Sequence, residues 1–236
     1  MDQSQLGDQC YMAGDHEGAE RAWLCAAEAG DVDAMAKVAL LYDDCGDKDQ
    51  AMRWYRPAAD GGNEAAMHNL ATLLEDAGDV DGAERWFLSA VGRGRSAAMH
   101  DFALFLMERR RTAEAEEWYE KAARAGEVKS MCNLGVLHQD RGNLHLAEAW
   151  FSRAVGAGYT RAGYYLGRLA HSKGDLPSAT TWCRHAAQGG DVESMYVTAR
   201  LALLAHNLDE ARYWGVRAAD AGHPAAQQEF RVLPAA

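Results

Sequence analysis

Aromatic and arginine side chains recur at equivalent places near the carboxyl-terminal end of the sequence. Tyr164 and Arg168 are followed 32 residues later by Tyr196 and Arg200. Arg161 and His171 lie beside the first pair. Tyrosine and arginine contribute much of the energy of binding when they are desolvated, and a guanidinium group pairs well with a carboxylate. These residues therefore indicate a surface that binds an acidic residue or a free carboxylate.

Acidic side chains dominate the corresponding positions earlier in the chain. They are Asp43, Asp44, Glu75, Asp76, Glu108 and Asp140. His68 and His100 hold the same place in their segments as Tyr164 does in its own. A peptide that is basic at one end and acidic at the other would complement this gradient. The alternative is that these side chains form a solvated polar face without a ligand.

The sequence predicts neither a catalytic centre nor a metal site. His68 and His100 are 32 residues apart, about one repeat and too far to share a metal. The five cysteines form no CxxC pair, which indicates free thiols. No serine or cysteine stands where a histidine would activate it. We therefore expect no enzyme activity, no cofactor and no metal.

Composition limits the class of partner. The 236 residues carry a formal net charge of −11, and 48% of them are hydrophobic. An acidic chain without a basic stripe is repelled by nucleic-acid phosphates. The first residues resemble no secretory signal, and no apolar run approaches the length that spans a bilayer. We expect a cytoplasmic protein that binds neither nucleic acid nor membrane.

The candidate binding residues belong to a sequence that repeats with a strict period of 32 residues, so the repeated elements must position them. Glycine marks the period at Gly30, Gly62, Gly94, Gly126, Gly158, Gly190 and Gly222. Tryptophan follows it at Trp54, Trp86, Trp118, Trp150, Trp182 and Trp214, whereas Trp23 comes one position late. Such a period is typical of a repeat array in which each unit buries its apolar face against its neighbours. We expect the tryptophans to pack between helices in the core.

Each repeat is predicted to contain two helices, A and B. Between Gly30 and Gly62, one apolar stripe at helical spacing ends before Cys45 and a second begins after Asp47. The predicted amino-terminal caps of the B helices are Asp47, Asp79, Thr112, Asn143, Asp175 and Asn207. Pro57 falls inside a B helix, where we expect a kink.

The period divides the chain into one domain of seven repeats and a final helix, roughly fifteen helices in all. The predicted repeats are residues 1–30, 31–62, 63–94, 95–126, 127–158, 159–190 and 191–222, and the cap is 223–236. Terminal repeats of an array are atypical, which agrees with the displaced Trp23.

The repeated string resembles Sel1-like repeats, which are related to tetratricopeptide repeats. The similarity lies in WYEKAARAG at 118–126, NLGVL at 133–137 and YYLGRLA at 164–170, and it extends over essentially the whole chain. The 32-residue period is shorter than is usual for Sel1-like repeats. The resemblance implies an all-α, right-handed superhelical α/α solenoid whose A helices line a concave groove.

The resemblance also implies a role as an adaptor or scaffold. The first hypothesis is that a peptide or protein segment binds in the groove. Leu203 and Leu204 are apolar residues at groove positions. They are expected either to pack on the terminal helix or to mark a surface for a partner or for self-association. The second hypothesis is therefore a self-associating structural protein whose homotypic contact lies near the carboxyl terminus.

Overall fold

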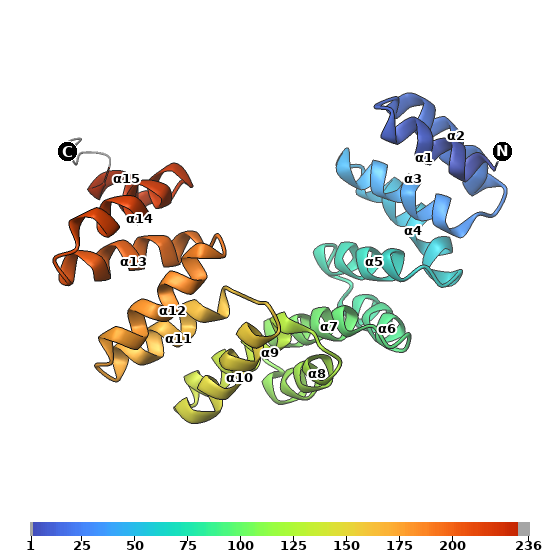
Figure 1. Ribbon diagram of the computed structural model, residues 1–236. Coiled ribbons are helices and arrows are strands. Elements are labelled where there is room, and N and C mark those ends of the chain that lie inside the picture. Colours follow the sequence, from blue (N-terminus) through green and yellow to red (C-terminus); the bar gives the residue numbers. More distant parts are fainter. Residues whose placement is uncertain (1, 231–236) are drawn as a thin grey trace. The chain divides into compact units, whose positions relative to one another are not determined.

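The computed structural model describes residues 2–230, which form fifteen α-helices and no strand (Figure 1). The helices are α1 (Gln3–Met12), α2 (His16–Glu28), α3 (Val32–Asp44), α4 (Lys48–Asp60), α5 (Glu64–Asp76), α6 (Val80–Val91), α7 (Ser96–Glu108), α8 (Thr112–Arg124), α9 (Val128–Asp140), α10 (Leu144–Gly156), α11 (Ala162–Ser172), α12 (Leu176–Gln188), α13 (Val192–Leu204), α14 (Leu208–Asp220) and α15 (Pro224–Glu229). The predicted all-α repeat fold is confirmed.

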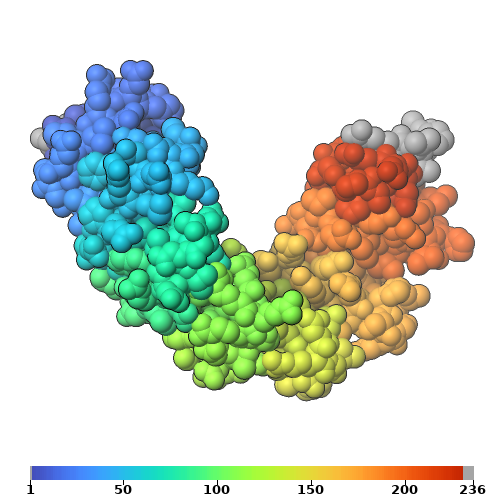
Figure 2. All heavy atoms as spheres, turned by 180° about the vertical axis from the view of Figure 1, so that it is seen from behind, coloured from blue at the N-terminus to red at the C-terminus, as the bar shows by residue number. Residues whose placement is uncertain are grey.

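Two compact units make up the chain, Met1–Ala115 and Glu116–Ala236. In the first unit each helix from α1 to α7 packs on the next, and in the second each helix from α9 to α15 does so. Figure 2 shows the same order within each unit, because neighbouring colours along the chain are neighbours in space. Contacts between sequence neighbours are typical of repeat arrays.

A left-handed residue follows each helix from α1 to α14 and sets the spacing of the array. The predicted glycine series has positive φ throughout, for example 96° at Gly30. A second series lies midway between its members and includes Gly46. Arg110 and His206 occupy that second series without being glycine, at φ 59° and 57°. Glycine adopts this backbone without a steric cost, so it is the common residue at the end of a helix.

Side chains at the helix starts satisfy free backbone N–H groups. Asp47, Asp79, Asp175 and Asn207 each accept a hydrogen bond from the residue three positions later, as predicted. Thr112 is not a cap, because it is the first residue of α8. Asn143 precedes α10 without a side-chain hydrogen bond at the cap, and α4 continues through Pro57.

The tryptophan ladder is less central than the sequence indicates. Five of its members, Trp54, Trp86, Trp118, Trp150 and Trp182, are only half-buried. The next residue along each B helix fills the core instead, as Tyr55, Phe87 and Phe151 do at 4% exposure or less. Trp23 belongs to this second series, which explains its displaced position. The expectation that the whole ladder is core is therefore wrong.

Small residues on A helices face these large residues on B helices. A Cβ atom added to Gly135 would lie 2.5 Å from the Phe151 ring, and one added to Gly7 would overlap Trp23. The last repeat inverts the arrangement, since its B helix has Gly215 and the ring of Phe230 fills the space beside it. The predicted cap is thus present as α15 and Phe230, while residues 231–236 of it lie outside the described residues.

Three further features bear on function. All five cysteines are free, as the sequence indicates. No helix within residues 2–230 is long and apolar enough to cross a membrane. In the same part of the chain, no three histidine, cysteine, aspartate or glutamate side chains gather closely enough to hold a metal ion.

Candidate binding site between helices α11 and α13

A hollow of about 490 Å³ lies between α11 and α13 in the second unit. Four of the predicted binding residues line it together: Arg168, His171, Tyr196 and Arg200. Leu204 borders the same hollow at 69% exposure. The 32-residue step explains this convergence, since successive A helices of an array lie side by side and present equivalent positions to one space.

The floor of the hollow is apolar. Cys183 from α12 and Val197 and Leu201 from α13 line it. Burial raises the pKa of the Cys183 thiol to about 11, so the thiol stays neutral. We call this site the α11–α13 pocket: an apolar floor with Arg168, His171 and Arg200 on its rim.

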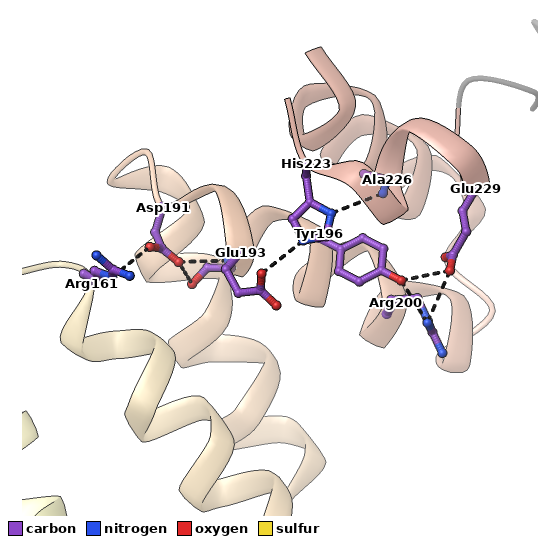
Figure 3. Close-up of polar contacts among 9 residues, drawn as sticks. Arg161, Asp191, Glu193, Tyr196, Arg200, His223, Ala226 and Glu229 are labelled. Atoms are coloured by element: carbon purple, nitrogen blue, oxygen red, sulfur yellow. Dashed lines mark hydrogen bonds and ion pairs between the residues drawn. The ribbon is translucent and has the colours of Figure 1, made fainter. Parts of the chain in front are cut away.

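A carboxylate from the same chain already occupies part of the rim. The Tyr196 hydroxyl donates a hydrogen bond of 2.8 Å to Glu229 Oε1 on α15, and Arg200 Nη1 lies 3.5 Å from the same oxygen (Figure 3). Arg200 also donates to the Tyr196 hydroxyl at 3.0 Å. Tyrosine and arginine spaced four residues apart on one helix thus hold one carboxylate between them.

His223 fixes Tyr196 from the other side. Their rings stack with centroids 4.3 Å apart, and His223 Nε2 lies 3.0 Å from Glu193 Oε2 (Figure 3). His223 also caps α15 by accepting from the Ala226 amide. These contacts hold the Tyr196 ring in place, so its hydroxyl is directed toward α15.

Tyr164 and Arg168 form the equivalent pair on α11. The Arg168 guanidinium lies 5.7 Å from the centre of the Tyr164 ring, which is half-buried. Burial raises the pKa of Tyr164. Among residues 2–230, Arg168 forms no ion pair, and Val197 occupies the place in α13 that Glu229 occupies in α15. This second pair therefore holds no carboxylate from residues 2–230.

Arg161 lies one turn before this pair, at the start of α11. Its Nε atom is 3.6 Å from Asp191 Oδ1, and its side chain is 63% exposed. Asp140, the last residue of α9, is exposed and remote in sequence from the α11–α13 pocket, whose lining does not include it.

The remaining predicted residues belong to the first unit. Asp76 pairs with Lys48 at 2.6 Å, and His68 Nδ1 lies 3.2 Å from Asp101. Glu108 ends α7, where a hydrogen bond with the neighbouring carboxyl of Glu75 raises its pKa. His100 is only 7% exposed, so the expectation that it lies open to a ligand is wrong.

Sequence reasoning missed the floor of the pocket and its internal carboxylate. Cys183 could have been found, because it follows Trp182, whereas an aromatic residue follows each of the four earlier tryptophans Trp54, Trp86, Trp118 and Trp150. Glu229 gives no such signal, since the short helix α15 that carries it is not part of a full two-helix repeat. Leu203 is 36% exposed, and Leu204 faces the start of α12 beside Leu176.

The middle of the chain matches a known family. The family model described as tetratricopeptide repeat matches residues 64–98, 95–127 and 128–156. No curated protein matches the chain in sequence.

Solved structures extend the likeness to both units. A protective antigen of uropathogenic Escherichia coli with an SLR fold is 24% identical with a TM-score of 0.72 over 97% of the chain, which spans only 55% of that protein's length. A Sel1 repeat protein from Oxalobacter formigenes is 22% identical with a TM-score of 0.73, covering 92% of this chain and 99% of its own. Pseudomonas aeruginosa PilF is 20% identical with a TM-score of 0.64, covering 85% and 96%.

These identities show the fold, and the family model adds the repeat type over residues 64–156. The helix pairs, their left-handed ends and the 32-residue step continue beyond that range. Residues 64–156 therefore match the tetratricopeptide repeat family, and residues 2–230 have the α/α repeat fold of the Sel1 repeat and tetratricopeptide repeat structures that they resemble.

Proposed function

We propose that this protein is a non-catalytic interaction scaffold whose α11–α13 pocket binds a segment of a partner protein. The segment carries an acidic residue or free carboxylate next to an apolar side chain. The carboxylate pairs with Arg168, and the apolar side chain rests on Val197 and Leu201.

The internal contact of Glu229 is the observation that supports this proposal. Tyr196 and Arg200 hold the Glu229 carboxylate, and Arg168 of the equivalent pair lines a hollow in which it has no carboxylate partner among residues 2–230. Charge-assisted hydrogen bonds of this kind are about twice as strong as neutral ones. A partner carboxylate would therefore find a pair of side chains of the kind that binds one elsewhere in the same unit.

A pair of matched peptides tests the proposal. Both carry a central leucine, with glutamate beside it in one and glutamine in the other, and binding is followed by fluorescence anisotropy. We expect the glutamate peptide to bind more tightly, with an affinity that falls as salt is added. Equal binding of the two peptides contradicts a role for the carboxylate.

Arg168→Ala combined with Arg200→Ala should abolish binding of the glutamate peptide while the helical circular dichroism is retained, because both side chains are exposed. Arg153→Ala combined with Arg217→Ala removes the same charge from the same unit and is the control. Affinity purification with mass spectrometry then identifies natural partners as those captured by the wild type and the control but not by the double variant.

A second candidate function is self-association near the carboxyl terminus. Exposed leucines favour it, since Leu204 and Leu208 are 69% and 70% exposed and Leu203 is 36% exposed. Light scattering after size-exclusion chromatography tests this candidate. A monomer at high protein concentration contradicts it, and an oligomer that Leu204→Glu with Leu208→Glu dissociates supports it.

A further inference from the structure

The first unit contains a second hollow, of about 440 Å³, between α1 and α3. Its lining includes Asp8, Tyr11, Trp23, Lys37, Leu40 and Asp44. Tyr11 and Leu40 are 49% and 47% exposed, so the hollow opens to solvent through apolar surface. We call it the α1–α3 pocket.

The α1–α3 pocket lies at the same position in its repeats as the α11–α13 pocket does in its own. Each residue that lines the α1–α3 pocket has an equivalent five repeats later in the chain, and that equivalent lines the α11–α13 pocket. Asp8 corresponds in this way to Arg168, Leu40 to Arg200 and Trp23 to Cys183. Two hollows of similar size at one repeat position, one in each unit, are unlike an isolated surface irregularity.

The charges of the two rims are reversed. Asp8 stands where the other pocket has Arg168, and Asp44 adds a carboxylate where the other has Leu204. Among residues 2–230, Asp44 forms no ion pair. Lys37 is the one cation among the residues that line the α1–α3 pocket, and it pairs with Asp8. The rim therefore carries a net negative charge.

Trp23 forms the wall of this pocket and is held in a fixed orientation. Its Nε1–H donates a hydrogen bond of 3.0 Å to Asp8, and the Tyr11 ring lies 5.5 Å away. The hydrogen bond from Lys37 lowers the pKa of Asp8, so this carboxyl is ionised near neutral pH. A rigid aromatic wall beside a carboxylate suits a side chain with an apolar stem and a cationic end.

We propose that the α1–α3 pocket is a second binding site, which takes a partner segment with an apolar side chain next to a lysine or arginine. The apolar side chain packs against Trp23, Leu40 and Leu41, and the cation pairs with Asp44. The site lies in the other unit from the α11–α13 pocket, so it stands or falls independently of the function proposed above.

Nuclear magnetic resonance of the full chain labelled with ¹⁵N tests this site. The probes are two short peptides that are identical except for the residues on either side of a central leucine, which are lysine in one and glutamate in the other. The Trp23 indole N–H reports on the α1–α3 pocket and is assigned by its absence in Trp23→Phe. The Gly167 amide reports on the α11–α13 pocket.

We expect the lysine peptide to shift the Trp23 resonance and to leave Gly167 unmoved. A Trp23 resonance that neither peptide shifts, or that both shift equally, overturns the proposal. A Gly167 resonance that the glutamate peptide fails to move contradicts the function proposed for the α11–α13 pocket instead, so the two failures are distinguishable.

Two variants check which groups recognise the peptide. Leu40→Arg introduces the residue type of the equivalent Arg200 in the α11–α13 pocket. Asp44→Leu introduces that of the equivalent Leu204. Each should weaken the lysine peptide by about tenfold or more. Leu88→Arg is the control, because Leu88 is 44% exposed on α6 and lines neither pocket. Equal weakening by Leu88→Arg would overturn the assignment of the site.

Discussion

The fifth and sixth repeats differ at one core position, which holds a large buried ring in the fifth and a small side chain beside a hollow in the sixth. In the fifth, Phe151 is fully buried and stacks on Tyr165 with ring centroids 4.9 Å apart. Cys183 of the sixth repeat takes the place of Phe151, Val197 of the seventh takes the place of Tyr165, and both line the α11–α13 pocket. Gly135 and Gly167 face the two B helices in the same manner.

A repeat array can acquire a site through a change of side chains at one repeat position. The backbone elements around both positions are equivalent, so the fifth and sixth repeats differ here in their side chains rather than in a loop. Filling such a position stabilises the array, because buried apolar area and close contacts both contribute. A repeat that leaves it empty gives up part of that stability and gains a concave surface.

The largest expected effect is at the filled position. Phe151→Ala should lower the free energy of unfolding by about 3–5 kcal/mol, since it removes a fully buried ring and leaves a cavity. Cys183→Ala at the equivalent place should cost about 1 kcal/mol. Urea denaturation measures both. Equal losses would show that the two positions do not differ in packing as described.

Filling the hollow is the converse experiment. Cys183→Phe with Val197→Tyr introduces the residues of the Phe151–Tyr165 pair, and Gly167 faces Cys183 as Gly135 faces Phe151. We expect a gain of about 2 kcal/mol in unfolding free energy and loss of the glutamate peptide. Urea denaturation and fluorescence anisotropy measure the two effects. A stabilised variant that still binds would place the ligand elsewhere.

A smaller loss of stability is expected at Tyr55, which holds the place of Phe151 in the second repeat and hydrogen-bonds with Asn69. Tyr55 is 1% exposed, and its hydroxyl accepts a hydrogen bond of 2.9 Å from Asn69. Burial raises the pKa of Tyr55 to about 12, so the hydroxyl stays protonated at all ordinary pH values. Tyr55→Phe should cost about 1 kcal/mol, because the ring remains and one hydrogen bond is lost. Urea denaturation checks this, with Tyr55→Ala as the contrasting larger loss.

The smallest effect depends on pH. The His68 ring packs edge-on against Phe87, and the hydrogen bond with Asp101 raises the pKa of His68 above its usual 6.5. A raised histidine pKa stabilises the fold most below the usual value, and the contribution is lost as pH rises through the raised pKa. Asp101→Asn should therefore cost less than about 1 kcal/mol under mildly acidic conditions, since the pair is partly exposed.

Alkaline solution is the control for that variant. There the histidine is neutral in both proteins, so Asp101→Asn and the wild type should unfold at nearly the same urea concentration. A difference that is independent of pH would mean that Asp101 acts through packing rather than through its charge.

The sequence predicts the fold well because its strongest signals are local. A glycine at a left-handed helix end and an aspartate at the next helix start each act within a few residues, and both keep their spacing along the chain. The sequence does not show which aromatic residue of each B helix is buried, because neighbouring residues on a helix point only about 100° apart. Trp150 and Phe151 both suit an apolar stripe, and only packing decides which of them is covered.

The site was predictable in its residue types but not in its shape. Arg168 and Arg200 share an offset in the repeat, and that is enough to place them on one face. The hollow depends on what is missing at Cys183 and Val197, which no motif signals. The burial of His100 likewise depends on neighbouring side chains rather than on its own place in the repeat.

The left-handed residues, spaced one helix apart, carry a consequence for how such a chain can change in length. Apart from the longer α6–α7 and α10–α11 linkers, each linker has three residues, namely a helix end, one left-handed residue and the residue before the next helix, as at Cys45, Gly46 and Asp47. An insertion of a single residue would rotate every later A helix relative to its neighbour. Growth by duplication of a whole repeat keeps the register, so chain length in this architecture is expected to change in steps of two helices.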